Sequence, residues 1–409
     1  MPHRAGIGVV FAIILIDMLG FGIVMPVLPQ LIMDLGQMPV DSAAVWAGWL
    51  GAGYAAMQFV FAPVIGNLSD RYGRRPVLLA ALFAFGIDYL VMGFAPNLWW
   101  LVAGRVLAGI TGASWSAGYA YIADVSPPEK RAANFGLMGM AFGLGFIFGP
   151  ALGGLLGSVD PRLPFFAAAG LAFLNVAVGL FVLKESLAPE HRRPFDWRRA
   201  NAFSALKALR HQSGAVLWFV AALGMWQLAH IVYPSIWSYV AIAAWGFDQK
   251  DIGIALAVVG LSSALVQGLG LRWVAPHLGE KVAVFLGIAS FGAAAVLYTT
   301  ATSTAMVYVA ILVGGLQGFI QPSIAALNSR AVDASSQGEL QGATQSIGAI
   351  AAIIGPPLYA AVFAKFSGPS AISQIPTMPL LVAAGFGAFT LALFLIGARR
   401  IKPVPSPDP

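Results

Sequence analysis

Cysteine is absent from this chain of 409 residues, and charged side chains are scarce. Without a thiol, disulfides, cysteine nucleophiles and cysteine-ligated metals are all excluded. Only 10% of the residues are charged, against roughly 25% in an ordinary soluble domain. Hydrophobic residues make up 59% of the sequence. A chain so poor in charge and so rich in apolar side chains is predicted to be a membrane protein.

Catalytic patterns are also missing. The five histidines are scattered, at His3, His191, His211, His230 and His277. Neither a zinc-binding HExxH nor a GxSxG nucleophile motif occurs. An intramembrane enzyme, which is one alternative for an apolar chain, would need paired catalytic groups or a metal cluster. The sequence therefore favours a protein that is not an enzyme and that holds no metal and no cofactor.

Long apolar runs are abundant instead. A spanning helix needs about 20 apolar residues, and continuous glycine-rich runs of this length indicate helices and not barrel strands. Twelve such runs can be delimited, at 7–33, 45–65, 76–94, 98–122, 133–157, 163–183, 215–244, 252–274, 282–300, 305–327, 340–363 and 378–398.

Basic residues lie mostly on one side of these runs. If both ends of the chain are cytoplasmic, 19 of the 23 Lys and Arg residues fall in cytoplasmic segments. Arg162, Lys250 and Lys365 fall on the opposite face, and Arg105 lies within a run. The positive-inside rule then places both termini and the basic segment 185–214 in the cytoplasm. The net charge of +6 is explained by topology, so nucleic acid is not expected as a partner.

Glycines and prolines recur at a constant offset of 206 residues. Gly109 and Gly112 match Gly315 and Gly318, Gly149-Pro150 matches Gly355-Pro356, and Gly73-Arg74-Arg75 matches Gly279-Glu280-Lys281. Coincidence in a glycine-rich chain is the alternative, but duplicated bundles are typical of transporters. We expect an all-α membrane protein with 12 transmembrane helices in two pseudo-symmetric six-helix bundles. The predicted boundaries are 1–184 and 215–398 for the bundles, 185–214 for a linker and 399–409 for a cytoplasmic tail.

Residues 66–75, Gly-Asn-Leu-Ser-Asp-Arg-Tyr-Gly-Arg-Arg, carry four charges between two apolar runs. Charge of this density cannot lie in hydrocarbon, so the segment marks a membrane surface. Gly66 and Gly73 are expected to allow a tight turn. Asp70 lies among three arginines, Arg71, Arg74 and Arg75. The ion pairs of such a cluster can change when helices move.

Three ionisable residues lie deep within spans: Asp17, Asp88 and Arg105. Each costs about 2.5–3.5 kcal/mol at a helix centre, so they are expected to face a cavity or one another. The positions 206 residues later hold Leu223, Ala294 and Ile311. The ionisable groups are thus confined to the first half. They are candidates for carrying H⁺ as a coupling ion, and a static ion pair that fixes helix packing is the alternative.

The pattern GxLxDRxGRR at residues 66–75 resembles the signature of the major facilitator superfamily. Residues 15–20 with 25–29 resemble the first helix of its tetracycline/proton antiporter branch, Asp88-Tyr89 resembles the third and Gly104-Arg105-x-x-x-Gly109 the fourth. The resemblance implies that Asp17, Asp88 and Arg105 take part in proton coupling. It also implies that Asp124 joins the charge network of the signature segment, in which Asp70 and Arg74 would latch the cytoplasmic side.

The fifth span carries a run of small residues that resembles the antiporter motif of exporters in this superfamily: Gly145, Gly149, Pro150, Gly153 and Gly154. Close helix packing through small residues explains the same glycines. The resemblance to the motif implies efflux in place of uptake.

The resemblance fails at two positions. In the tetracycline branch, the eighth helix carries a His and the ninth an Asp that act in drug and proton handling. This chain has Ser263 and Phe291 there. The resemblance therefore does not extend to tetracycline–metal recognition, and proton chemistry would rest on the carboxylates of the first half.

The seventh span offers other candidates for substrate binding. Trp226, His230, Tyr233 and Trp237 recur at spacings of four and three and share one helical face. With Gln227, this face suits a flat amphipathic ligand with polar edges, and an aromatic packing stripe is the alternative. His230 is also a second candidate for coupling. Further residues expected to line the cavity are Trp115, Tyr119, Gln317 and Gln321.

The sequence thus predicts a proton-driven antiporter that exports an amphipathic organic compound by alternating access. A metabolite uptake symporter or facilitator of the same fold is the alternative, and a non-transporting receptor is a third. The expected partners are a small-molecule substrate and membrane lipid, with the protein as a monomer. The expected location is the bacterial inner membrane.

Overall fold

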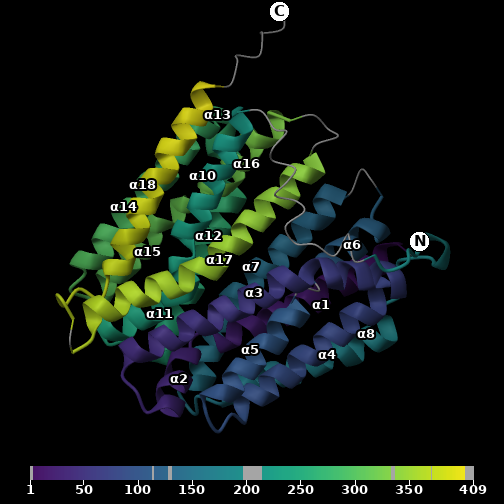
Figure 1. The fold of residues 1–409 in the computed structure, drawn as a ribbon, viewed down its shortest axis with the longest axis horizontal. Helices are drawn as coiled ribbons and strands as arrows, with labels where there is room; N and C mark the ends of the chain where they lie inside the picture. Colours follow the sequence, from purple (N-terminus) through teal and green to yellow (C-terminus); the bar gives the residue numbers. More distant parts are fainter. Residues whose placement is uncertain are drawn as a thin grey trace, which may run out of the picture. The chain divides into compact units, whose positions relative to one another are not determined.

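The computed structural model describes residues 3–112, 115–127, 131–196, 214–332, 337–369 and 371–400. Within these ranges every regular element is a helix (Figure 1). The first series is α1 His3–Val24, α2 Leu28–Gly36, α3 Val40–Tyr72, α4 Arg74–Gly93, α5 Leu98–Gly112, α6 Trp115–Val125, α7 Arg131–Gly157 and α8 Leu163–Val182. The second is α10 Gly214–His230, α11 Val232–Trp245, α12 Gln249–Leu265, η4 Val266–Gly270, α13 Leu271–Leu278, α14 Glu280–Thr300, α15 Thr304–Gly314, η5 Gly315–Phe319, α16 Ile320–Arg330, α17 Gln337–Ser367 and α18 Met378–Arg399.

The predicted spans correspond to these helices. In the described part of the chain, ten helices or continuous helical runs are long and apolar enough to cross a membrane. An eleventh span is formed by Val10–Val24 and Leu28–Gly36, which meet at 45°. Pro26 lies in this break. Proline lacks the amide hydrogen that a helix requires, so it interrupts the helix here. The remaining expected span, 98–122, is divided between α5 and α6. The prediction of an all-α membrane protein is confirmed.

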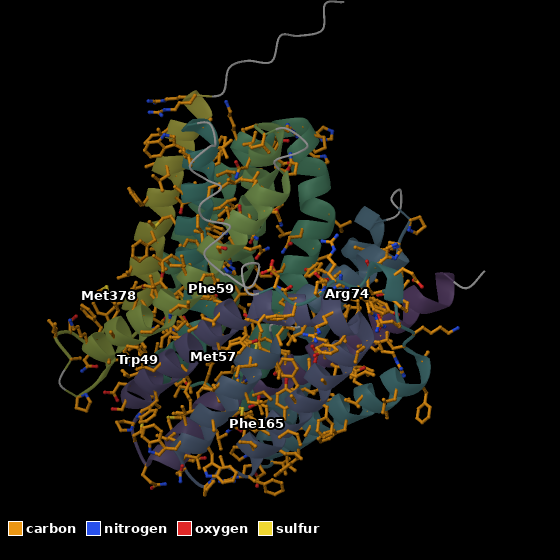
Figure 2. All side chains as sticks on the ribbon, turned by 45° about the vertical axis from the view of Figure 1, so that its right-hand side comes forward. Trp49, Met57, Phe59, Arg74, Phe165 and Met378 are labelled. Carbon is orange, nitrogen blue, oxygen red and sulfur yellow. The ribbon has the colours of Figure 1, made fainter. Side chains whose placement is uncertain are left out.

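Large apolar side chains cover the outside of the protein as well as its inside. Phe165 of α8 is fully buried, whereas Trp49 of α3 is 66% exposed; both are labelled in Figure 2. Trp99 of α5 and Phe181 of α8 are exposed in the same way. An exterior with so many exposed apolar side chains marks a surface that is not in contact with water. The hydrocarbon of a bilayer requires such an apolar surface.

The turn predicted at Gly66 is wrong. α3 continues through Gly66 to Tyr72, so residues 66–72 form the last turns of a long helix. The helix ends at Gly73, which has a φ of 105°, a conformation that glycine adopts without steric cost. α4 begins directly afterwards, at Arg74. A helix that projects beyond hydrocarbon keeps its backbone hydrogen bonds while its charges reach water, so the charge cluster does not require a loop.

Packing divides the chain into two compact units. The first comprises Met1–Ala202, Tyr233–Leu261 and Pro356–Pro376, and the second comprises Phe203–Val232, Ser262–Gly355 and Thr377–Pro409. This grouping follows helix packing and not the order of the chain, so the boundaries at 184 and 215 stay a prediction. In the expected linker, residues 185–196 have no regular structure apart from the short turn η2, Pro189–His191. Residues 197–213 and the tail beyond 400 lie outside the described ranges.

Glycines bring α1 and α7 of the first unit into backbone contact. A Cβ added at Gly149 would lie 2.7 Å from Cα of Gly22, and one added at Gly153 would overlap the carbonyl group of Ile23. Gly145 contacts Met18 in the same way. Because 145, 149 and 153 are spaced by four, they lie on one face of α7.

A second face of α7 packs against α12. A Cβ at Gly154 would lie 2.6 Å from the carbonyl oxygen of Gln249, and one at Gly253 would lie 2.5 Å from the carbonyl oxygen of Pro150. The glycines that resemble the antiporter motif therefore allow two helices to approach α7 at once. This is the packing explanation of the motif, and its link to efflux stays a prediction.

Substituting Gly153 by alanine is expected to destabilise the first unit by about 1–3 kcal/mol, because the added methyl meets backbone that cannot move aside. Gly143→Ala is the matched control on the same helix, since no atom lies within 4 Å of a Cβ added there. It should change the free energy of unfolding by less than about 0.5 kcal/mol. Thermal unfolding of the two purified variants measures the difference, and equal midpoints would contradict the close α1–α7 contact.

The predicted repeat has structural counterparts. Gly279 has a φ of 80° and precedes α14, just as Gly73 precedes α4. Pro150 lies inside α7, and Pro356 lies inside α17. Positions 206 residues apart thus adopt equivalent conformations, which favours duplication over coincidence.

Candidate proton-coupling and transport site

A buried ion pair joins α4 and α5 in the first unit. Nη2 of Arg105 donates to Oδ2 of Asp88 over 3.0 Å and approaches Sδ of Met92 at 2.9 Å. The Asp88 side chain is fully buried. Gly104 leaves room for the pair, because a Cβ there would lie 2.5 Å from Oδ1 of Asp88. That oxygen and Nε of Arg105 have no hydrogen-bond partner among the described residues, so the pair retains unused polar atoms.

α3 places an aromatic ring against Arg105. The guanidinium carbon lies 5.7 Å from the ring centroid of Tyr54, within the range of cation–π attraction. Nε2 of Gln58 donates to the Tyr54 hydroxyl over 3.4 Å and to the carbonyl of Gly112 over 3.2 Å. Gly109 lets α5 approach α3 closely, since a Cβ added at this glycine would lie only 2.6 Å from the Tyr54 carbonyl oxygen. The guanidinium is thus held between a carboxylate and a phenol ring.

Asp17 of α1 lies at a cavity of about 180 Å³ within the first unit. The cavity is lined by Asp17, Met18, Phe21, Tyr54, Phe85, Tyr89 and Phe142. Within the described ranges, the Asp17 carboxylate makes no hydrogen bond or ion pair. Tyr54 contacts both the cavity and Arg105, so the three predicted ionisable residues belong to one region. Their role in coupling is a proposal that the geometry permits.

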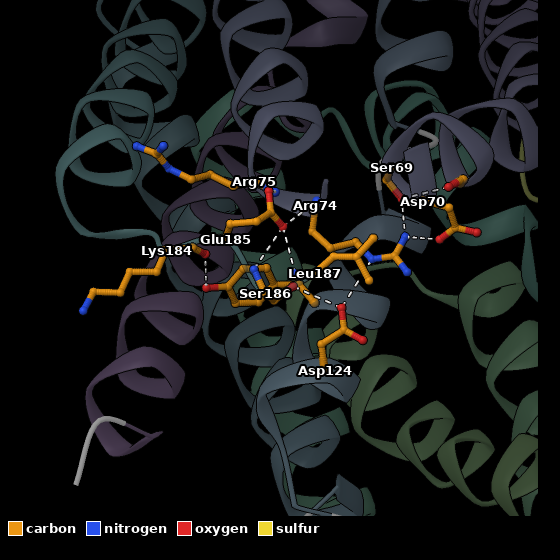
Figure 3. A network of polar contacts seen from close by, with 11 residues as sticks. Ser69, Asp70, Arg74, Arg75, Asp124, Lys184, Glu185, Ser186 and Leu187 are labelled. Carbon is orange, nitrogen blue, oxygen red and sulfur yellow. Dashed lines mark hydrogen bonds and ion pairs between the residues drawn. The ribbon is translucent and has the colours of Figure 1, made fainter. Parts of the chain in front are cut away.

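Where α3 and α6 end and α4 begins, Arg74 is the centre of a polar network (Figure 3). It pairs with Asp70, its Nε lies 3.4 Å from Oδ2 of Asp124, and its Nη1 donates to Oγ of Ser69 over 2.6 Å. Ser186 donates to the same Asp124 oxygen over 3.1 Å. Three helix ends are therefore joined through one guanidinium.

The other two arginines of the signature segment make separate side-chain contacts. Nη2 of Arg75 donates to the carbonyl of Leu180, near the end of α8, over 2.6 Å. The guanidinium of Arg71 lies over the ring of Tyr72, 5.1 Å from its centroid, and the Arg71 side chain is exposed. Of the predicted switch residues, Asp70, Arg74 and Asp124 are brought together, whereas Arg71 is not.

Glu185 is a further member of the network that the sequence analysis did not identify. Its Oε1 accepts from the backbone amide of Arg74 over 2.9 Å, and its Oε2 accepts from that of Arg75 over 3.3 Å. It thereby caps the first turn of α4, whose N-cap residue Gly73 has no side chain. A carboxylate at a helix N-terminus also interacts favourably with the helix dipole. The only signal in the sequence was an acid directly after the sixth span.

Glu185→Ala should expose the start of α4. Loss of a capping group costs about 1 kcal/mol, which corresponds to roughly fivefold faster local opening. Hydrogen–deuterium exchange of the peptide that contains Arg74 and Arg75 measures this opening. Glu190→Ala, at an exposed acid in η2, is the matched control and should leave the exchange unchanged. Unaltered exchange in Glu185→Ala would show that the cap is dispensable.

An ion pair of reversed polarity occupies the equivalent place in the second unit. Arg330 at the end of α16 pairs with Glu280 at the start of α14. These positions follow Asp124 and Arg74 by 206 residues. Each half thus joins the start of its third span to the end of its fourth, with the signs exchanged.

The predicted substrate face lies on one span, Gly214–Trp245, which is interrupted at Ile231. α10 ends at His230, and α11 begins at Val232. Trp226 is 2% exposed, and its ring lies 5.1 Å from that of Phe291. Trp237 is equally buried, against aromatic rings of the α11–α12 connection. Both tryptophans are core residues, as the alternative of a packing stripe predicts.

The remaining substrate candidates have varied environments. The His230 ring is tilted by 44° against that of Trp226, with ring centroids 5.5 Å apart, while Gln227 and Tyr233 are partly buried. Tyr119 is 50% exposed on α6, and Gln321 is exposed on α16. Gln317 lies in η5, and its Oε1 is buried without a partner in the described part of the chain. The side chain of Trp115 lies outside the described residues.

Comparison with known proteins decides the family. Residues 10–356 match the family model described as Major Facilitator Superfamily. The chain belongs to the major facilitator superfamily. It is 40% identical over 364 residues to tetracycline resistance protein class C of Escherichia coli, across 89% of this chain and 91% of that protein. The class B protein of Escherichia coli is 33% identical over 356 residues, across 87% and 88%. The resemblance to this superfamily and its tetracycline branch is confirmed.

Solved structures of this superfamily share the fold. A single-residue mutant of the nucleoside transporter NupG superposes with a TM-score of 0.78 at 13% identity, across 96% of this chain and 99% of that one. The human organic anion transporter MFSD10 (TETRAN) gives 0.71 at 23% identity, across 96% and 100%. At these identities the likeness concerns the fold alone. The membership and the apolar helices together make this chain an integral multi-pass membrane protein.

At the two positions where the tetracycline branch carries a His and an Asp, this chain has Ser263 and Phe291, which are uncharged. Phe291 is 1% exposed and packs against Trp226 in the core of the second unit. Ser263 of α12 is partly buried. Neither side chain titrates, so these positions supply no group for metal or proton handling.

Proposed function

We propose that the protein is a proton-coupled antiporter that exports an amphipathic organic compound by alternating access. The observation that carries the proposal is the Asp17 carboxylate, which faces an aromatic cavity without an ion-pair partner in the described part of the chain. An ionisable group of this kind within a membrane span marks a substrate or ion pathway. The relatives of the tetracycline branch are named for resistance to tetracycline, which supports drug efflux as the direction.

Each charged group has a proposed role. Asp17 takes up and releases H⁺ as the cavity changes the side of the membrane to which it opens. The Asp88–Arg105 pair sets the field at the cavity through Tyr54. Asp70, Arg74 and Asp124 hold the cytoplasmic ends of α3, α4 and α6 together in one state, and their separation accompanies the other. A bistable element of this kind is what alternating access requires.

The proposed location is the bacterial inner membrane, with both termini in the cytoplasm. The distribution of Lys and Arg supports this orientation. The protein is proposed to act as a monomer in lipid, with the transported compound as its binding partner. No cofactor is proposed, because H⁺ is the coupling ion.

Inside-out vesicles test the proposal. An acidic lumen is established, a pH-sensitive dye reports it, and candidate amphipathic compounds are added. An exported compound should enter the vesicles and release lumenal protons, and vesicles without the protein should not respond. Uptake into right-side-out vesicles that is indifferent to the pH gradient would instead show a facilitator.

A further inference from the structure

Two arginines at the end of α18 have no acidic partner in the described part of the chain. Arg399 and Arg400 are both exposed, and neither takes part in the ion pairs that the described residues form. Arg330 at the end of α16, by contrast, is paired with Glu280. The end of α18 therefore carries two positive charges that the described residues leave without a counter-charge.

Arg400 is nevertheless held in a defined position. α10 and α18 pack side by side in the second unit (Figure 1). The guanidinium carbon of Arg400 lies over the ring of Trp218 on α10, 5.4 Å from its centroid, within the range of cation–π attraction. A Cβ added at Gly214, one helical turn earlier, would lie only 3.3 Å from Nη1 of Arg400. The side chain thus crosses from α18 to the first turn of α10.

This arrangement leaves the hydrogen-bonding groups of Arg400 available. A guanidinium contacts an aromatic ring through its face, while its N–H groups point outward in its own plane. No described residue accepts a hydrogen bond from the Arg400 side chain. The fixed fork of N–H donors matches two oxygens of a phosphate group. The contact with Trp218 therefore presents a guanidinium that is ready to bind an anion.

Apolar side chains continue from the two arginines along the outside of the same helices. Leu395 and Ile396 precede Arg399 and Arg400 by four residues, so each lies one turn further into the span on the same face of α18. They are 47% and 37% exposed, and Leu217 of α10 is 42% exposed. A cationic end next to an apolar surface matches a phospholipid, in which a phosphate group precedes the acyl chains. A water-soluble anion would gain nothing from the apolar part.

We propose that the ends of α10 and α18 bind one anionic phospholipid. Its phosphate group contacts the guanidinium groups of Arg399 and Arg400, and its acyl chains lie along Leu217, Leu395 and Ile396. A zwitterionic lipid binds less well, because its ammonium group places another positive charge beside two arginines. Basic residues at the end of a span also set topology, but topology requires no aromatic ring that fixes a guanidinium. The site does not depend on the proposed antiport.

Native mass spectrometry of the delipidated full-length protein in detergent tests this site. Phosphatidylglycerol is the probe, because its headgroup is anionic, and phosphatidylethanolamine with the same acyl chains is the zwitterionic comparison. One arginine near an anionic headgroup contributes about fivefold in affinity. The first phosphatidylglycerol should therefore bind about tenfold or more tightly than the first phosphatidylethanolamine. Glycerophosphoglycerol, which is the same headgroup without acyl chains, should not displace the lipid at equal concentration.

Arg399→Gln/Arg400→Gln should abolish the preference for phosphatidylglycerol. Arg400→Lys keeps the charge but loses the planar fork of donors, so it should weaken binding about threefold or more. Lys250→Gln/Lys365→Gln is the matched control, since it removes two positive charges from exposed positions on α12 and α17, and it should bind like the wild type. Thermal unfolding shows which variants are folded, and if the double arginine variant is not, Arg400→Lys decides.

Three results would overturn the inference. The first is equal binding of the two lipids by the wild type. The second is a preference for phosphatidylglycerol that persists in a folded Arg399→Gln/Arg400→Gln protein, or that disappears equally in the lysine control. The third is displacement of the lipid by an equal concentration of glycerophosphoglycerol, which would show a site for a soluble phosphodiester in place of a lipid.

Discussion

Asp17→Asn is expected to reduce proton-driven substrate flux to that of vesicles that lack the protein. Asparagine has nearly the same shape as aspartate, so the cavity and the helix packing around it should persist. It cannot bind and release a proton, and Asp17 is the only carboxylate among the described residues that line the cavity. The loss should therefore affect coupling and not folding.

The measurement is dye-reported proton release from inside-out vesicles on addition of an exported compound. Asp34→Asn serves as the control for loss of one negative charge and should transport at the wild-type rate. Thermal unfolding of purified Asp17→Asn separates a folding defect from a coupling defect. Undiminished flux in a well-folded Asp17→Asn protein would remove this residue from the mechanism.

Arg105→Gln is expected to destabilise the first unit by about 3–5 kcal/mol, the cost of leaving one member of a buried ion pair without its partner. Asp88 is fully buried, and its Oδ2 has Arg105 as its only hydrogen-bond donor among the described residues. Without the guanidinium, Asp88 must either remain as an uncompensated charge or take up a proton. Both outcomes raise the free energy of the folded state.

The double variant Asp88→Asn/Arg105→Gln provides the matched comparison. It removes both charges and keeps hydrogen-bonding groups of similar size, so it should recover most of the stability lost in Arg105→Gln. A double-mutant cycle of unfolding midpoints gives the coupling between the two residues. If the double variant is as unstable as Arg105→Gln, the destabilisation comes from lost packing against Tyr54 and Met92, and the ion pair is not its cause.

Periodicity and the cost of charge in lipid were enough to predict the helices and to select Asp17, Asp88 and Arg105. They could not show which acid pairs with the arginine. Asp88 is the partner because Gly104 lets α4 and α5 approach, a tertiary feature that no local pattern contains. The Glu185 cap was missed for the same reason, since its partners lie 111 and 110 residues away along the chain.

Two segments show how far a side-chain pattern locates the end of a helix. The helical face predicted over residues 226–237 lies on one span, Gly214–Trp245, which is interrupted only at Ile231, between α10 and α11. The segment 66–75 was predicted to be a loop with a tight turn that Gly66 and Gly73 allow, but α3 continues through Gly66 to Tyr72 and only Gly73 lies between the two helices. In both places the backbone hydrogen bonds, and not the side-chain pattern, decided where a helix ends.

The helices α4 and α14, which begin at the two charge-reversed ion pairs, have different sources of negative charge at their N-termini. Glu280 gives α14 an acid in its first turn, whereas α4 starts with two arginines and has no acid of its own there. The first half obtains the missing anion from Glu185, at the head of the segment that leaves α8. The segment that follows α8 is consequently bound to the start of α4 through Glu185. In the proposed mechanism, a movement that separates Arg74 from Asp124 would therefore also displace Glu185.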